Sequence, residues 1–177
     1  DVYKRQSVDE ILDSQIDRKP QGQQTIIAFG ASTGGTVILR DILKPLPEDM
    51  PGIVIVQHMP KAFTNSFAKT LNQDCKLLVK EAREGELVER GKVLISPGDQ
   101  HMILKSKGAG YTVSMNSGEL VNRHRPSVDV LFRSVANVAG SFAIGIILTG
   151  MGDDGAIGIC EMRQAGCKTF AQNEESC

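Results

Sequence analysis

The chain has 177 residues, of which 41% are hydrophobic and 23% are charged, as is typical of a globular domain. Its 20 basic and 21 acidic side chains leave a formal net charge of −1, so no strong field favours a nucleic acid partner. Aromatic residues make up only 5%, which argues against the stacking platforms of single-strand binders. No apolar run reaches the ~20 residues that a membrane span needs. We therefore expect neither nucleic acid binding nor direct membrane insertion.

The cysteines and histidines are spread along the chain without the spacing of metal ligands. The three histidines, His58, His101 and His124, lie in separate segments. The four cysteines contain no Cys-x-x-Cys pair and are too sparse for a disulfide scaffold. We therefore expect no metal site. Reduced cysteines in a chain of ordinary composition favour the cytoplasm.

Residues 1–24 differ in composition from the rest of the chain. Six of these 24 residues are apolar and nine are charged, and the run ends in Lys-Pro-Gln-Gly-Gln-Gln. Such a composition predicts a linker or disordered N-terminal segment, with one helical turn near residues 8–16. A single domain is expected to follow from residue 25 onward.

From residue 25 onward, short β-rich runs alternate with stretches of helical spacing. Runs of β-branched residues bounded by Gly or Pro predict strands buried on both faces at residues 25–29, 53–56, 93–95, 143–148 and 169–171. Helical spacing covers residues 36–43, 62–71, 128–138 and 156–165. Residues 101–105 and 111–115 flank a glycine-containing turn and predict a β-hairpin. The alternation predicts a parallel sheet covered by helices, with a small antiparallel insertion.

Polar residues follow three of the predicted parallel strands, at the edge where ligands bind in such sheets. Ser32 lies in a Gly-x-Ser-x-Gly turn after the first strand, in the pattern of a nucleophile elbow. His58 follows the second strand, and Asp153 and Asp154 follow the strand at 143–148. A serine, a histidine and a carboxylate are the set that serine hydrolysis needs, as nucleophile, base and orienting group.

Each of these residues also has an alternative interpretation. The glycine-rich turn could cradle a phosphate at a helix N-terminus, although it contains neither Gly-x-Gly-x-x-Gly nor a Walker lysine. His58 could be a satisfied histidine at a strand end, and the two aspartates could be acids of a helix start. A nucleotide- or phosphate-binding α/β module therefore stays open. The chain order Ser, His, Asp excludes the α/β-hydrolase fold, whose order is Ser, Asp, His.

Two further groups compete for roles at this edge. His101 follows the strand at 93–95 and is the rival base, but it starts the predicted hairpin, so we expect it to line a rim or to pack. Ser127 precedes the helix at 128–138 and is most simply its N-cap.

Four long motifs, in the right order, resemble the catalytic domain of bacterial chemotaxis protein-glutamate methylesterases. They are Gly-Ala-Ser-Thr-Gly-Gly at 30–35, Gln-His-Met-Pro at 57–60, Asn-Arg-His-Arg-Pro-Ser-Val-Asp-Val-Leu-Phe at 122–132 and Leu-Thr-Gly-Met-Gly-Asp-Asp-Gly at 148–155. The similarity runs from about residue 25 to the last residue. It implies a doubly wound α/β domain that hydrolyses γ-glutamyl methyl esters on the cytoplasmic helices of chemoreceptors and can deamidate receptor glutamines. No metal or organic cofactor is implied.

The resemblance also implies roles for single residues. By motif position, Ser32 is the nucleophile, His58 the general base and Asp154 the carboxylate that orients the base. Thr33 and Met151 match positions that line the family's site, and the backbone N–H of Met151 is expected to help bind the oxyanion.

The chain departs from the family's pattern in two places. Asp153 stands where we expect asparagine, which leaves the choice between Asp153 and Asp154 open. The family's domain continues beyond Cys177, so residues 25–177 are expected to be a methylesterase catalytic domain truncated at its C-terminus. Residues 1–24 resemble the end of the family's linker to a receiver domain, which is then an expected partner in the full-length protein. A non-catalytic receptor-binding domain is the second alternative.

Overall fold

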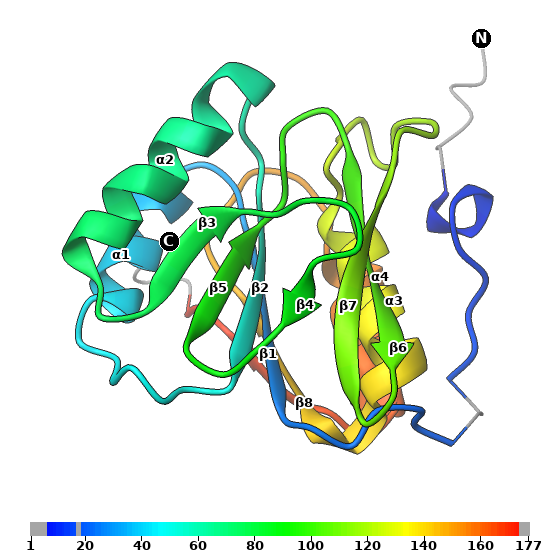
Figure 1. Cartoon of the computed structure of the whole chain (residues 1–177). Coiled ribbons are helices and arrows are strands. Elements are labelled where there is room, and N and C mark those ends of the chain that lie inside the picture. The colour runs from blue at the N-terminus through cyan, green and yellow to red at the C-terminus, as the bar shows by residue number, and fades with distance from the viewer. Residues whose placement is uncertain (1–6, 17–18, 174–177) are drawn as a thin grey trace, which may run out of the picture.

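The computed structural model describes residues 7–16 and 19–173, and its centre is a six-stranded parallel sheet (Figure 1). The strand order is β3-β5-β2-β1-β8-β9, and every neighbouring pair runs parallel. The strands are β1 Ile26–Ala31, β2 Gly52–Gln57, β3 Leu78–Glu81, β5 Lys92–Ile95, β8 Ala143–Ile147 and β9 Lys168–Ala171. The predicted α/β fold with a mostly parallel, doubly wound sheet is confirmed.

Helices cover both faces of the sheet, because the central strands present apolar side chains to both sides. α1 (Gly35–Leu43) and α2 (Lys61–Asp74) cover the face to which Ile27 and Phe29 of β1 point. α3 (Val128–Ala139) and α4 (Ala156–Gln164) cover the opposite face, with Ile26 and Ala28 of the same strand. Apolar residues that follow one another along the central strands thus join the two separate cores alternately, as the period of two along a strand requires. Within the described residues, no helix is both long and apolar enough to span a membrane.

A second sheet has three antiparallel strands in the order β4-β7-β6. β6 (His101–Lys107) and β7 (Gly110–Asn116) form the predicted hairpin, and β4 (Leu87–Val88) pairs with the outer side of β7. Buried residues of this sheet join the core that contains α3. Neither β3 nor β4 was among the predicted strands. Both are short and about half exposed, so they lack the apolar run that identifies the central strands.

The described part of residues 7–24 lies along α3 and the hairpin (Figure 1). A 3-10 turn at Val8–Glu10 buries Val8, which is 1% exposed. The backbone N–H of Gln15 donates to Asn137 Oδ1 of α3 at 2.7 Å, and the hydroxyl of Tyr111 donates to the carbonyl of Gln24 at 2.9 Å. This part of the segment is therefore not fully solvated. That it is a linker between domains stays a prediction.

Arg133 on α3 joins the N-terminal segment to α4. Its guanidinium donates to the carboxylates of Glu161 and Asp9, and its side chain is 5% exposed. We expect Arg133→Ala to lower the free energy of unfolding by about 3–5 kcal/mol, because the nearly buried Glu161 carboxylate would lose its partner. Urea denaturation measures this. The control is Asp9→Asn, whose side chain is 70% exposed and whose expected loss is below about 1 kcal/mol. Equal losses in the two variants would contradict the prediction.

Candidate active site

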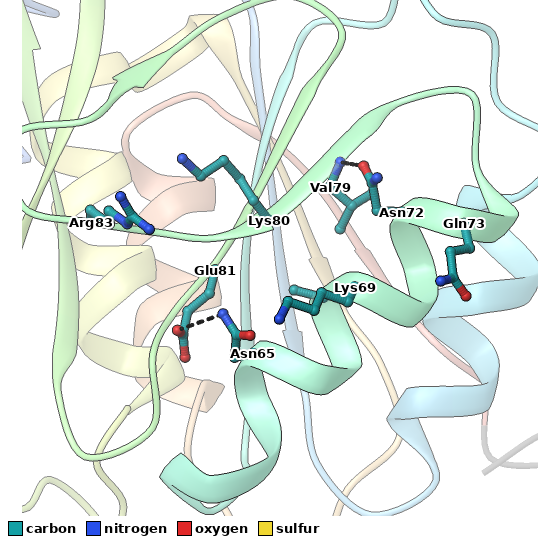
Figure 2. A pocket seen from close by; sticks show the side chains of 9 residues that line it. Asn65, Lys69, Asn72, Gln73, Val79, Lys80, Glu81 and Arg83 are labelled. Atoms are coloured by element: carbon teal, nitrogen blue, oxygen red, sulfur yellow. Dashed lines mark hydrogen bonds between the residues drawn. The ribbon is translucent and has the colours of Figure 1, made fainter.

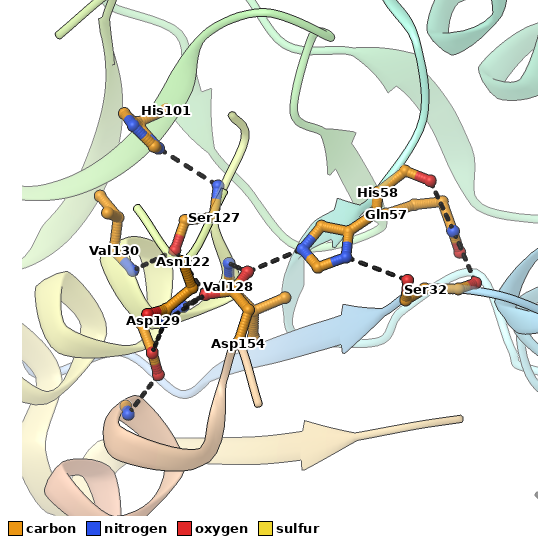
Figure 3. Close-up of polar contacts among 11 residues, drawn as sticks. Ser32, Gln57, His58, His101, Asn122, Ser127, Val128, Asp129, Val130 and Asp154 are labelled. Atoms are coloured by element: carbon orange, nitrogen blue, oxygen red, sulfur yellow. Dashed lines mark hydrogen bonds and ion pairs between the residues drawn. The ribbon is translucent and has the colours of Figure 1, made fainter. Parts of the chain in front are cut away.

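Ser32, His58 and Asp154 meet at the carboxyl edge of the parallel sheet (Figure 3). They follow β1, β2 and β8, which are neighbours in the sheet, and the chain switches sides of β1 at this point. Such switch points form the crevice where open α/β sheets bind their ligands. His58 Nδ1 lies 3.0 Å from Ser32 Oγ, and His58 Nε2 lies 2.7 Å from Asp154 Oδ2. Three residues far apart in the sequence thus form one continuous hydrogen-bonded row.

Ser32 is held in a tight turn between β1 and α1. Its backbone N–H donates to the carbonyl of Thr149 at 3.0 Å, and its carbonyl accepts from the N–H of Gly35 at 2.9 Å. Left-handed backbone in this turn occurs at Gly34, with φ 81°, and not at the serine. Only glycine adopts that conformation without steric cost. The expected strand-to-helix turn is therefore present, and its unusual backbone angle lies two residues after the serine.

The backbone around His58 is tied to the serine turn by a neighbouring side chain. The amide Nε2 of Gln57 donates to the carbonyl of Ser32 at 2.8 Å and to that of His58 at 3.2 Å. Gln57 is 2% exposed, and the N–H of His58 also donates to the carbonyl of Ala31 at 3.0 Å. These bonds hold the ends of β1 and β2 at a set separation. Sequence reasoning missed Gln57, because a glutamine at a strand end has no signature of its own.

Asp154 is buried against the N-terminus of α3, and its side chain is 1% exposed. Besides His58, it accepts from Ser127 Oγ at 2.6 Å and from the backbone N–H groups of Val128 at 2.7 Å and Asp129 at 3.2 Å. Burial alone would raise the pKa of this carboxyl, but the hydrogen bonds from His58, Ser127 and Val128 outweigh it and hold the pKa of Asp154 below its ordinary value. Asp154 is therefore ionised at neutral pH.

The charge of Asp154 determines which nitrogen of His58 carries the proton. An ionised carboxylate can only accept, so the Nε2–H of a neutral His58 donates to Asp154 Oδ2. Nδ1 is then unprotonated and faces Ser32 Oγ at 3.0 Å, where it can accept the hydroxyl proton. The row can therefore move a proton from Ser32 to His58 and stabilise the resulting imidazolium, which is the chemistry of a serine nucleophile activated by a base.

His101, the rival base, is fully buried and its ring nitrogens are occupied elsewhere. Its Nε2 donates to the carbonyl of Glu119 at 2.8 Å, and its Nδ1 accepts from the N–H of Ser127 at 3.2 Å (Figure 3). The histidine packs, as one of the two sequence expectations had it. Ser127 is the N-cap of α3, with its hydroxyl accepting from the N–H of Val130. His101 thus supports the helix start that surrounds Asp154.

Comparison with known proteins identifies the family of this chain. Residues 27–177 match the family described as CheB methylesterase. The chain belongs to the CheB methylesterase family. It is 53% identical to "Protein-glutamate methylesterase/protein-glutamine glutaminase 2" of Albidiferax ferrireducens over 99% of this chain and 52% of that protein. A protein of the same name from Rhizobium johnstonii is 61% identical over 86% of this chain and 42% of that protein.

A solved structure of the CheB family has the same fold. The crystal structure of the Thermotoga maritima CheB methylesterase catalytic domain matches with a TM-score of 0.85 and 39% sequence identity, over 88% of this chain and 82% of that one. The chain spans about half the length of the curated relatives it matches. With the CheB family established, a nucleotide-binding module no longer explains the glycine-rich turn.

Thr33 and Met151, the other two residues that the family resemblance implies for the site, differ in whether they line the hollow beside Ser32. Met151 is 80% exposed and lines a hollow of about 60 Å³ together with Ser32, His58 and Asp154. Gly150 lines it too, and a Cβ at that position would lie 2.5 Å from Ser32 Cβ, so this close approach requires glycine. Thr33 is exposed in the serine turn and is not among the lining residues. The roles of Thr33 and Met151 stay predictions.

Only one aspartate of the pair reaches the base. Asp154 binds His58, whereas Asp153 is exposed and its backbone carbonyl accepts from the N–H of Ala156 at 3.1 Å. The N-cap of α4 is Gly155, without a side-chain cap, so neither aspartate holds the capping position considered from the sequence. Asp154 instead accepts hydrogen bonds from the first backbone N–H groups of α3, which lies far from it in sequence.

A larger hollow lies between α2 and β3 and has a structural explanation (Figure 2). It has a volume of about 320 Å³. Asn72 Oδ1 accepts from the N–H of Val79 at 2.8 Å, and Asn65 Nδ2 donates to Glu81 at 3.4 Å, so the polar groups of the hollow tie the helix to the edge strand.

Among the described residues, no group of three or more His, Cys, Asp or Glu side chains is placed to hold a metal ion.

Proposed function

We propose that this chain is the catalytic part of a protein-glutamate methylesterase that hydrolyses γ-methyl esters of glutamates on the cytoplasmic helices of chemoreceptors. The observation that carries the proposal is the hydrogen-bonded row of Ser32, His58 and Asp154 at the sheet's switch point. The names of the relatives supply the substrate class, methyl esters of protein glutamates, and the family resemblance adds the chemoreceptor as the protein that carries them. Because these helices are cytoplasmic, we place the reaction in the cytoplasm. From the family resemblance we also expect a receiver domain as a partner in the full-length protein.

The reaction follows from the positions of the protons. His58 Nδ1 takes the hydroxyl proton of Ser32 as Oγ attacks the ester carbonyl, and Asp154 stabilises the imidazolium through Nε2–H. The tetrahedral intermediate collapses, His58 returns the proton to the methoxide oxygen, and methanol leaves. Water, deprotonated by His58, then cleaves the acyl-enzyme to give glutamate and free Ser32. We assign oxyanion stabilisation to backbone N–H donors of the serine turn and of Met151.

Deamidation of receptor glutamines is the second activity of the same site, and the relatives' names include a glutaminase. It uses the same acyl-enzyme, with ammonia in place of methanol as the leaving group. A hollow of about 60 Å³ suits the end of one glutamyl or glutaminyl side chain presented from outside. We infer that the substrate helix stays on the surface and inserts a single side chain.

The direct test is methanol release from a methylated receptor fragment, and the two aspartates provide a matched pair of variants. We expect Asp154→Asn to lower kcat by about 10⁴, because an amide favours the wrong tautomer of His58, as in the serine proteases. Asp153→Asn should have little effect, because its side chain is exposed and does not bind the base. Melting temperatures check that both variants fold.

Two results for this pair of variants would contradict the role assigned to Asp154. A severe loss in Asp153→Asn with near-normal turnover in Asp154→Asn would reverse the roles of the two aspartates. Equal, mild losses would remove the carboxylate from the mechanism. Absence of methanol release by the parent chain would end the methylesterase proposal for this stretch of sequence.

A further inference from the structure

The imidazole of His124 lies flat on the imidazole of His58. The ring centroids are 3.7 Å apart and the ring planes differ by 6°. Parallel rings at this separation are stacked in van der Waals contact, one face against the other. The turn that carries His124 also fixes where its ring lies.

His124 ends a two-residue turn with unusual backbone angles. The N–H of Val121 donates to the carbonyl of His124 at 3.0 Å, and the N–H of His124 donates to the carbonyl of Val121 at 2.8 Å. Between them, Asn122 and Arg123 have φ angles of 48° and 68°. Non-glycine residues seldom adopt this left-handed region, and asparagine does so more readily than arginine. Residues held in such conformations cluster at functional sites, which makes this turn a candidate for a role.

Contacts at the start of the turn anchor it to the active site. Val121 is fully buried in a small apolar cluster next to α3. Asn122 Nδ2 donates to Asp129 Oδ2 at 2.7 Å and to Asp154 Oδ1 at 3.4 Å (Figure 3). The turn is thereby fixed to the same carboxylate that binds the base. The ring at its end has a set position relative to the whole hydrogen-bonded row.

The base requires a constraint that its two hydrogen bonds do not supply. Ser32 Oγ and Asp154 Oδ2 hold the ring of His58 through its two nitrogens, both in the plane of the ring. Such bonds leave the ring free to tilt about the line that joins the two partners. A flat surface against one face of the ring removes that freedom. The constraint matters because a misplacement of about 1 Å in an active site can cost about 10²-fold in rate.

We propose that His124 is a positioning residue, whose ring covers one face of the His58 imidazole and holds it in the plane that joins Ser32 to Asp154. The proposal rests on the proposed esterase function, since it assigns His124 a role in that site. It also explains why the turn at 121–124 keeps left-handed backbone at two residues that have side chains.

The charge state of His124 suits this role. Burial, followed by the charge of the neighbouring His58, holds the pKa of His124 below its ordinary value, against the opposing effect of Asp154 and Asp153. His124 therefore presents a neutral ring. When His58 takes the serine proton, its positive charge develops against the face of a neutral ring and meets no like charge there. Two charged rings at the same separation would repel each other.

Substitutions at position 124 separate the flat face of the ring from its other properties. Leucine is similar in size but has no flat face, whereas phenylalanine keeps the face and has no ring nitrogen. We expect His124→Leu to lower kcat for methanol release by about 10- to 100-fold with KM unchanged, because only the geometry of the base is disturbed. His124→Phe should retain a kcat close to that of the parent. Melting temperatures monitor folding, and His124→Ala replaces the leucine variant should the latter fail to fold.

Nitrogen-15 NMR of the imidazole of His58 supplies a readout that needs no turnover. In the parent and in His124→Phe, the relaxation rates of the His58 ring signals are expected to show a ring held in one orientation, whereas in His124→Leu they should show increased motion of the ring. Unchanged kcat in His124→Leu, or equal losses in the leucine and phenylalanine variants, would overturn the proposal. Should the parent release no methanol, the esterase proposal fails by itself. The NMR signals then decide the role of His124, and unchanged motion of the His58 ring in His124→Leu would refute it.

Discussion

Replacing Ser32 with alanine is expected to abolish methanol release while leaving the fold intact. The substitution removes the nucleophilic oxygen, which lies 3.0 Å from His58 Nδ1. The turn itself is held by backbone bonds to Thr149 and Gly35, which alanine keeps. Loss of a triad nucleophile costs about 10⁶ in kcat in a serine protease. An ester is a less demanding substrate than an amide, so we expect a smaller loss that still leaves almost no turnover.

The measurement is methanol release from a methylated receptor fragment at saturating substrate, with melting temperature as the check on folding. Ser66→Ala is the matched control, because Ser66 is an exposed serine on α2 whose hydroxyl donates to a carbonyl of its own helix. The control should turn over like the parent. Turnover within tenfold of the parent in Ser32→Ala would end the serine-hydrolase assignment.

The positions of Ser32, His58 and Asp154 at the ends of their strands could be predicted because each depends on a local signal. Buried β-branched runs mark β1, β2 and β8, and a polar residue directly after such a run lies at the carboxyl edge of a parallel sheet. The glycines around Ser32 mark a tight turn in the same local way. That the three strands are neighbours is a property of the topology, and no local signal gives the strand order. There the family resemblance implied that the three residues act together.

Other parts of the site depend on contacts between segments far apart in the sequence. Asp154 accepts hydrogen bonds from two backbone N–H groups at the start of α3, which belong to residues 25 and 26 positions earlier in the chain. His124 stacks on a ring that lies in a different motif. No periodicity or composition indicates such pairs, because neither partner has an unusual neighbourhood of its own. The asparagine and arginine before His124 likewise give no sign of a left-handed turn.

His58, the proposed base, is the second residue whose replacement should almost abolish methanol release. We expect His58→Gln to reduce kcat nearly as far as Ser32→Ala, because glutamine has no group that can take the serine proton. In a protease triad, removal of the histidine alone costs about as much as removal of all three members. Methanol release by the folded variant measures it, and melting temperature is the check on folding, because the buried carboxylate of Asp154 loses one of its hydrogen-bond donors in this variant.

His101→Gln is the matched substitution, and it should affect stability rather than chemistry. His101 is fully buried and bonds to the carbonyl of Glu119 and the N–H of Ser127, so breaking these bonds is expected to cost about 1–3 kcal/mol. Its ring touches the helix start that surrounds Asp154, and kcat should therefore fall modestly, far less than in His58→Gln. If His101→Gln were inactive and His58→Gln active, the roles assigned to the two histidines would have to be exchanged. The base would then have to reach Ser32 by a route other than the bond between His58 Nδ1 and Ser32 Oγ.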